Sequence, residues 1–247
     1  MKSKATLALL GVLLVGGLTS ARAAELNGVA ISGNVALATD YRFRGISQLD
    51  RSPAIQGGFD VEWENGFYIG TWASNVSFSG GAIELDVYAG FAGDINETVS
   101  YDVGFLYYAY PEDDADPSLD YYEFYGSLSF YDATIGVHYS PDYFAETDSF
   151  FYVYGAYSYA LADNMTLDFH LGWNKFDGDD SFAAFIEPAP GANPGDDYMD
   201  YSVGLTMTAL DLDFGLHFIG TDLSKSECFG GTKLCDDSLV FSVSKSL

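Results

Sequence analysis

Hydrophobic and polar residues alternate with a period of two along most of this chain, and the alternation restarts at each cluster of turn-forming residues. Segments of this kind are about ten residues long, the length of a strand in a membrane-spanning barrel. They predict twelve strands, at residues 29–41, 54–64, 67–78, 82–93, 98–110, 120–131, 133–139, 149–161, 165–176, 197–208, 210–221 and 237–247. Beyond residue 24 no apolar run reaches the roughly 20 residues of a membrane-spanning helix, so the pattern predicts an all-β chain.

The connections between these segments alternate between short and long. Short turns occur at residues 64–66, 93–97, 131–132, 162–164 and 209–210, and longer connections occur at 42–53, 111–119, 140–148, 177–196 and 222–236. The connection at 79–81 is short, although its place in the alternation would make it one of the longer connections. This arrangement is typical of an up-and-down antiparallel β-barrel of about 12 strands, with short periplasmic turns, longer extracellular loops and both termini on the short-turn side.

Each predicted strand has one apolar face and one polar face. The ninth segment carries Leu167, Phe169 and Leu171 on one face, and Asp168 and His170 on the other. A soluble lipocalin-like barrel or a β-sandwich would enclose the apolar face. Twelve strands about 4.8 Å apart and tilted by about 40° enclose a barrel about 24 Å wide, which one layer of side chains cannot fill. We therefore expect a transmembrane barrel whose apolar face meets lipid and whose polar face lines a wet lumen.

The first 24 residues have the composition of a secretory signal. Lys2 and Lys4 precede a mostly apolar run at residues 5–18, and small residues follow up to Ala24. A membrane anchor is the alternative, but the run is shorter than the roughly 20 residues of a spanning helix. We expect residues 1–24 to be cleaved, and residues 25–247 to form a single barrel domain in the bacterial outer membrane.

The charge of the chain is strongly negative. Its 247 residues include 36 Asp and Glu against 10 Lys and Arg, a formal net charge of -26. Such a chain repels nucleic acid and offers no basic patch for it. The expected partners are outer-membrane lipid, small solutes or cations, and the periplasmic chaperone and barrel-assembly machinery.

Several stretches resemble a known bacterial family. Residues 32–48 (SGNVALATDYRFRGISQ) and 53–59 (PAIQGGF) are similar to the opening of the TorF-type porins, also called the Gcw_chp family, of unknown function. Further similar stretches are residues 66–76, 107–111, 121–123 and 138–143. The resemblance implies an outer-membrane location and a pore, and it brings no catalytic residue. One departure from outer-membrane barrels in general is Leu247, which stands where an aromatic residue is usual.

Carboxylates dominate the polar face of the predicted barrel. The candidate pore-lining acids are Asp40, Asp60, Glu62, Glu64, Glu84, Asp86, Asp102, Glu123, Asp168, Asp200 and Asp213. Their negative potential would concentrate cations and exclude anions, which predicts a weak preference for cations. The alternative is that these acids only keep the lumen hydrated.

Two arginines share the lumen parity at the mouth of the first strand. Arg42 and Arg44 lie close to Asp40 in the sequence. They would form a charged constriction or hold an anionic group of a solute by paired hydrogen bonds. Equally, they would pair with neighbouring acids, because an arginine facing an acidic lumen needs a partner.

The histidines and cysteines indicate structure rather than catalysis. His138, His170 and His217 fall on the lumen face of alternate strands, about 10 Å apart, which is too far for a shared zinc ion. We expect a lumen histidine to bond to a carboxylate. No G-x-S-x-G motif occurs, so the sequence predicts no catalytic site, no metal and no cofactor. Cys228 and Cys235 lie in the last long loop and are expected to form a disulfide in an oxidising compartment.

Together these features favour a narrow porin-like channel for the passive passage of small hydrophilic solutes or ions. Side chains of about 6 Å on each wall would leave a lumen about 12 Å wide. Inward tyrosines such as Tyr88 and Tyr108 would narrow it further. The alternative is a barrel that conducts nothing and presents its acidic loops to partners or stabilises the envelope.

Overall fold

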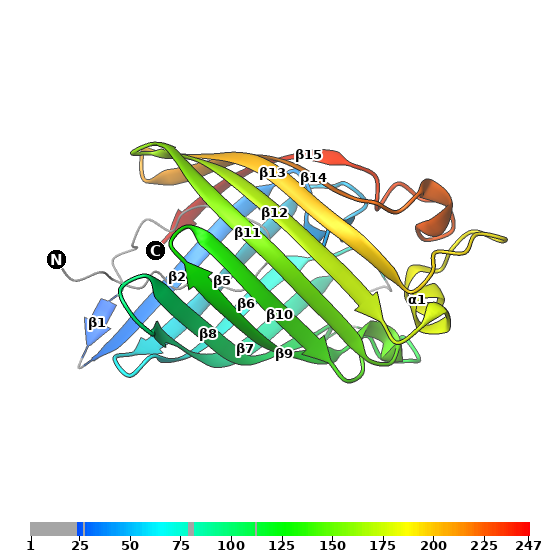
Figure 1. Ribbon diagram of the computed structural model, residues 1–247, viewed down its shortest axis with the longest axis horizontal. Coiled ribbons are helices and arrows are strands. Elements are labelled where there is room, and N and C mark those ends of the chain that lie inside the picture. Colours follow the sequence, from blue (N-terminus) through cyan, green and yellow to red (C-terminus); the bar gives the residue numbers. More distant parts are fainter. Residues whose placement is uncertain (1–23, 27, 79–81, 112) are drawn as a thin grey trace.

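The computed structural model describes residues 24–26, 28–78, 82–111 and 113–247. The predicted signal peptide therefore lies outside the described residues, apart from residue 24. In the described part of the chain, twelve long antiparallel strands form a closed barrel, in the order in which they follow one another (Figure 1). These strands are β2 (Val29–Ala38), β5 (Ala54–Trp63), β6 (Phe67–Asn75), β7 (Ile83–Asp94), β8 (Val99–Ala109), β9 (Tyr121–Phe130), β10 (Ala133–Ser140), β11 (Phe150–Ala162), β12 (Met165–Phe176), β13 (Asp197–Ala209), β14 (Leu212–Thr221) and β15 (Ser238–Ser246).

The barrel closes where β2 meets β5 on one edge and β15 on the other. β2 pairs with β5 along its whole length, but with β15 only from Asn34 to Ala38. At the start of that edge, residues 29–31 pair with a short strand that lies outside the twelve predicted ones, β1 (Ala24–Leu26). The predicted up-and-down barrel is confirmed, with β1, the C-terminus and the short turns at one end and the long loops at the other (Figure 1).

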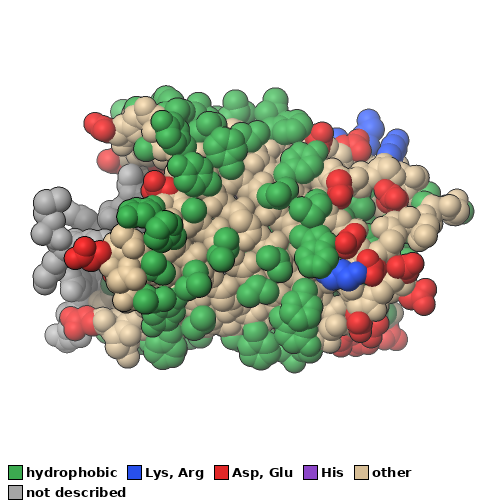
Figure 2. All heavy atoms as spheres, viewed as in Figure 1, with side chains coloured by type: hydrophobic (Ala, Val, Ile, Leu, Met, Phe, Trp, Pro, Cys, Tyr) green, Lys and Arg blue, Asp and Glu red, His purple; other side chains and the backbone are tan. Residues whose placement is uncertain are grey.

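The outer wall is apolar. Large side chains such as Ile55, Phe59 and Leu171 point away from the barrel and are exposed. In Figure 2 the barrel wall carries hydrophobic side chains over most of its length, while acidic side chains gather mainly around the long loops. An apolar belt suits contact with the hydrocarbon interior of a membrane. Closure of the barrel suits it too, because no strand edge leaves backbone groups unpaired in lipid. Within the described residues, no helix is long and apolar enough to cross a membrane.

Inside the barrel, tyrosines pack against glycines on neighbouring strands. Gly70 pairs with Tyr88 across β6 and β7, and a Cβ atom at Gly70 would lie 2.3 Å from the Tyr88 ring. Only glycine leaves room for a ring that lies this close to the wall. The Tyr88 hydroxyl then donates to Asp60 at 2.5 Å. The same pattern recurs where Tyr125 lies against Gly104. The inward rings thus lie near the wall because a glycine on the neighbouring strand stands opposite each of them.

The long loops contain structure that the alternation pattern did not predict. A helix, α1 (Asp179–Ile186), lies in the loop between β12 and β13. Its first turn carries two aspartates, which suit the positive end of the helix dipole. Phe182 and Ile186 are fully buried, and the Phe182 ring stacks on Phe176 with ring centroids 4.7 Å apart. Two short 3-10 helices, η1 (Phe144–Glu146) and η2 (Lys225–Glu227), lie in neighbouring loops.

The last long loop contains a disulfide between Cys228 and Cys235, both of them buried. This loop docks on α1, because the N–H of Phe229 donates to the carbonyl of Ile186 at 2.8 Å. It also contacts the first long loop, where the N–H of Ser47 donates to the carbonyl of Leu234 at 2.9 Å. The bridge therefore restrains a loop that joins two others, and this loop meets the barrel where the Thr221 hydroxyl of β14 donates to the carbonyl of Cys235 at 3.1 Å.

Replacing both cysteines with serine is expected to lower the stability of the folded loop by about 2 to 3 kcal/mol, which is the contribution that chain entropy gives for a ring of this size. Limited proteolysis should then cut within residues 222–237 faster than in the wild type. The barrel contact, from the Thr221 hydroxyl of β14 to Cys235, uses the backbone carbonyl, which serine keeps, so heat-modifiable migration on gels should be retained. Loss of the folded band in the double variant would contradict this assignment.

Candidate functional site

The first long loop, residues 39–53, leaves the wall and enters the barrel. It contains a small hairpin of β3 (Arg42–Phe43) and β4 (Ile46–Ser47), and most of its residues are buried. Its contacts reach opposite walls: the Tyr41 hydroxyl donates to Glu84 of β7 at 2.6 Å, and the Tyr198 hydroxyl of β13 donates to the carbonyl of Arg44 at 3.2 Å. We call residues 39–53 the folded-in loop. It crosses the lumen near the long-loop end of the barrel.

Arg44 anchors the folded-in loop to the wall. Its Nη2 atom lies 2.7 and 2.9 Å from the two carboxylate oxygens of Glu123, on β9. The side chains are 4% and 0% exposed, so this is a buried ion pair. Glu123 also accepts from the Tyr108 hydroxyl at 3.1 Å, and the guanidinium lies 4.4 Å from the centroid of the Tyr152 ring. Burial opposes the charge on Arg44, but the Glu123 carboxylate and the neighbouring tyrosines together outweigh it and raise the pKa of Arg44.

Arg42 shapes the hairpin. Its Nε atom donates to Asp40 at 2.9 Å, and its Nη1 atom donates to the carbonyls of Gly45 at 2.9 Å and Asp236 at 2.8 Å. Burial raises the pKa of Asp40, although the Ser47 hydroxyl and Arg42 partly counter this effect. Two roles were predicted for these arginines: a charged constriction or anion site for solutes, or pairing with neighbouring acids. The structure shows both arginines in ion pairs with acids. Arg42 joins the folded-in loop to the last long loop.

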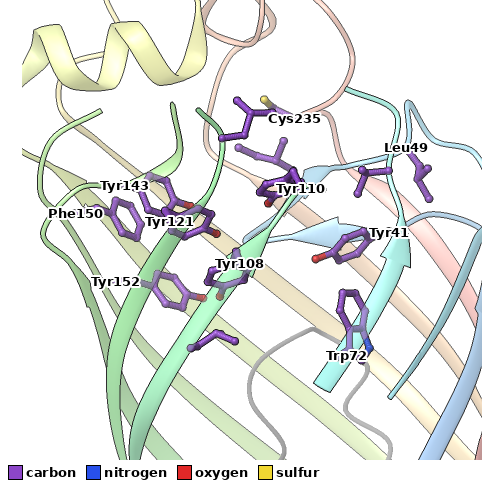
Figure 3. Close-up of a cluster of buried hydrophobic side chains, with 14 of the residues drawn as sticks. Tyr41, Leu49, Trp72, Tyr108, Tyr110, Tyr121, Tyr143, Phe150, Tyr152 and Cys235 are labelled. Carbon is purple, nitrogen blue, oxygen red and sulfur yellow. The ribbon is translucent and has the colours of Figure 1, made fainter. Parts of the chain in front are cut away.

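Aromatic rings surround the folded-in loop (Figure 3). Tyr108 stacks on Tyr121 with ring centroids 4.3 Å apart, and Tyr143 stacks on Phe150 at 4.0 Å. These rings come from β8, β9, β11 and the loop before β11. On the other side of the close-up, Tyr41 meets Trp72 edge to face at 5.4 Å. The aromatic rings and the folded-in loop together narrow the lumen at its long-loop end.

Most of the predicted lining acids are buried inside the barrel, and most of these accept hydrogen bonds from neighbouring side chains. The acids that are at most 7% exposed are Asp40, Asp60, Glu84, Asp86, Glu123, Asp168, Asp200 and Asp213. Asp168 accepts from the Ser158 hydroxyl at 2.8 Å, and Asp213 accepts from the Thr208 hydroxyl at 2.5 Å. These acids therefore lie inside the barrel, as the alternation of the sequence predicted.

The remaining predicted acids lie nearer to solvent. Asp102 is half-buried and accepts from the Tyr68 hydroxyl at 2.6 Å. Glu62 is half-buried near the end of β5, and Glu64 is exposed in the turn after that strand. Glu62 and Glu64 therefore mark the short-turn rim of the barrel, away from the folded-in loop.

The histidines lie in the lumen beside acidic groups. His138 Nδ1 lies 2.9 Å from Glu123, and His170 Nε2 lies 3.2 Å from Asp200. His217 is buried on β14. Among the described residues, no three His, Cys, Asp or Glu side chains gather as a possible metal site. The arrangement is a polar network inside a barrel, with the acids in excess.

Sequence reasoning missed several members of this network. Asn174 is fully buried and donates to Asp200 at 2.8 Å, and the Tyr152 hydroxyl lies 2.7 Å from His170 Nε2. The Tyr143 hydroxyl accepts from Arg44 at 3.2 Å. Asn174 has the same inward parity as the predicted Asp168 and His170 of β12, so this signal was available for it. Tyr152 lies on β11, where no site residue was predicted, although its parity is inward. Tyr143 lies in a loop, where parity gives no information.

With this geometry in view, comparisons with known proteins become informative. The family model described as a bacterial protein of unknown function (Gcw_chp) matches residues 22–247. The chain belongs to this family. The predicted resemblance to Gcw_chp is thus confirmed over nearly the whole chain. No curated protein matches the sequence.

Solved structures of outer-membrane porins share the fold of this Gcw_chp member. A KdgM porin has a TM-score of 0.55 at 11% identity, covering 87% of this chain and 97% of its own. A NanC porin has a TM-score of 0.52 at 11% identity, covering 87% of this chain and 98% of its own. A KdgM porin in complex with disordered oligogalacturonate has a TM-score of 0.52 at 10% identity, covering 87% and 96%. The predicted barrel fold is confirmed. At identities this low, the solute of one protein cannot be assigned to another.

Proposed function

We propose that this protein is an outer-membrane channel for the passive passage of small hydrophilic solutes or ions, with a preference for cations. One observation supports the proposal above the others: the closed barrel is apolar on its outer wall and lined with carboxylates on its inner wall. An acidic lining has no use against lipid, but in a wet lumen it attracts cations. Catalysis is not part of the proposal, and lipid, small solutes and the assembly machinery remain its expected partners.

The charge balance of the lumen supports the cation preference. The two buried arginines, Arg42 and Arg44, are each paired with a carboxylate. Acids such as Asp60, Asp168 and Asp213 meet neutral hydroxyls instead, so their charge is not cancelled by a cation in those contacts. One structural neighbour was solved with oligogalacturonate, which is a polyanion. An acidic lining of this kind disfavours polyanions, so we propose a different solute class for this chain.

The folded-in loop supports a second candidate function. Together with the stacked tyrosines, it crosses the lumen and is held by buried ion pairs at Arg42 and Arg44. A barrel closed in this way would conduct nothing, and its acidic loops would serve partners or the envelope. The two candidates differ in one measurable property, which is current through the barrel.

Single-channel recording in planar bilayers separates the two candidates. We expect the wild type to give small, discrete conductance steps. A variant whose residues 41–51 are replaced by a short Gly-Ser linker should give larger steps, because the narrowing loop is removed. A variant with the same linker in place of residues 114–118 is the control, and its steps should match the wild type. No steps in the wild type, with steps in the 41–51 variant, would favour the closed barrel and contradict the channel.

A further inference from the structure

Asp86 differs from the other buried acids of the barrel. It lies on β7, points into the lumen and is 2% exposed. Its Oδ1 atom is buried and has no hydrogen-bond partner among the described residues. In the register of the sheet it lies between Trp72 of β6 and Tyr108 of β8. A buried carboxylate oxygen without a donor is costly, and it calls for a counter-charge.

The hydroxyls around Asp86 are directed elsewhere. Tyr41 and Tyr110 donate to Glu84, at 2.6 and 2.7 Å. Tyr108 donates to Glu123 at 3.1 Å. Each phenol proton is therefore taken by another carboxylate. The phenol oxygens keep lone pairs that are free to coordinate a cation.

The fixed charges near Asp86 are also negative. Glu84 and Glu123 are the ionisable side chains that act on it most strongly, and both oppose its negative charge. Glu123 is compensated by Arg44, whereas the hydrogen bonds to Glu84 come from neutral phenols. Glu84 and Asp86 are two residues apart on one strand, so their side chains share the lumen face. They form a pair of buried carboxylates without a protein cation.

We propose that Glu84 and Asp86 form a binding site for one partly dehydrated monovalent cation, K⁺ or Na⁺, inside the lumen. The carboxylates and the Tyr41 and Tyr110 oxygens supply hard oxygen ligands, and Trp72 and Tyr108 are the neighbours of Asp86 across the sheet. Among the described residues no third His, Cys, Asp or Glu joins this pair as a possible metal ligand, whereas protein Ca²⁺ sites usually gather several carboxylates. The inference rests on the proposed function, because the channel supplies the cation and the site gives its preference a location.

Cation binding is measurable without any current. Trp72 lies beside Asp86, so tryptophan fluorescence of the detergent-solubilised barrel should change saturably with KCl, while N-methyl-D-glucamine chloride keeps ionic strength constant. Asp86→Asn should abolish the change, and Glu84→Gln should weaken K⁺ binding at least tenfold. Asp132→Asn removes an exposed carboxylate in the β9–β10 turn and should respond as the wild type does. Heat-modifiable migration checks that each variant is folded.

The outcomes separate the site from the channel. A wild type that responds no more to K⁺ than to N-methyl-D-glucamine overturns the site, and so does an unchanged K⁺ response in folded Asp86→Asn. A fluorescence change that follows pH and ignores K⁺ means that Asp86 holds a proton, which also overturns it. Conductance without Asp86-dependent K⁺ binding rejects the site and leaves the channel. K⁺ binding without conductance supports the site and rejects the channel.

Discussion

Replacing Arg44 with alanine is expected to lower the free energy of unfolding by about 3 to 5 kcal/mol, because the buried Glu123 would lose its arginine and keep only His138 and the Tyr108 hydroxyl as partners. The carboxylate accepts two bonds from Arg44, at 2.7 and 2.9 Å, and neither residue is more than 4% exposed. Water therefore cannot replace the lost partner. The folded-in loop should lose its hold on β9, and single-channel conductance should rise. Urea titration of the refolded protein in lipid vesicles measures the stability.

Arg51 provides a matched control for this variant. It lies in the same loop, but its ion pair with Asp236 spans 3.9 Å and its side chain is 31% exposed. Exposed pairs of this kind contribute about 0 to 1 kcal/mol, so Arg51→Ala should stay near the wild type. Arg44→Lys should be intermediate, since one ammonium cannot reproduce the guanidinium fork. Equal stability of the Arg44 and Arg51 alanine variants would show that the folded-in loop is not held by this ion pair.

A charge placed on the apolar belt is the second large effect that we expect. Leu171 lies near the middle of β12, and it is 54% exposed on the outer wall. Arginine at the midplane of a membrane barrel costs about 2 to 4 kcal/mol. Leu171→Arg should therefore lower the free energy of unfolding in lipid vesicles by this amount. In a soluble barrel the same exposed change would have little effect.

Leu210 offers the same chemical change outside the belt. It is 90% exposed in the turn between β13 and β14, at the short-turn end of the barrel. Leu210→Arg should change the free energy of unfolding by no more than about 0.5 kcal/mol, as surface substitutions usually do. If both arginine variants unfold at the wild-type urea concentration, the outer wall of β12 does not face hydrocarbon.

Much of the fold was predictable because strand alternation is a local signal. The segment predicted at 165–176 is the observed β12 (Met165–Phe176), since its apolar and polar residues alternate without interruption from Met165 to Trp173. The segment predicted at 29–41 ends early, at Ala38. Residues 39–41 still alternate, but there the chain turns inward to the lumen. Local pattern cannot tell a strand that continues from a loop that packs inside.

The contacts of the site were less predictable than its residues. Parity places Glu84, Asp86 and Glu123 inside the barrel, and the structure shows all three buried there. The partner of Glu123 is Arg44, 79 residues away in the sequence. That pairing depends on the path of the folded-in loop, which long-range packing decides. α1 was also missed, because its eight residues are too few for a clear helical period.

The reversal potential across a KCl gradient tests the central claim most directly. A cation-preferring channel should give a potential that corresponds to K⁺ over Cl⁻. The preference should weaken in concentrated salt, as the Debye length falls from about 10 Å at 0.1 M to about 3 Å at 1 M. Replacing Glu62, Glu84 and Asp86 together with their amides should reduce it. A potential that corresponds to Cl⁻ over K⁺ in the wild type would contradict the account.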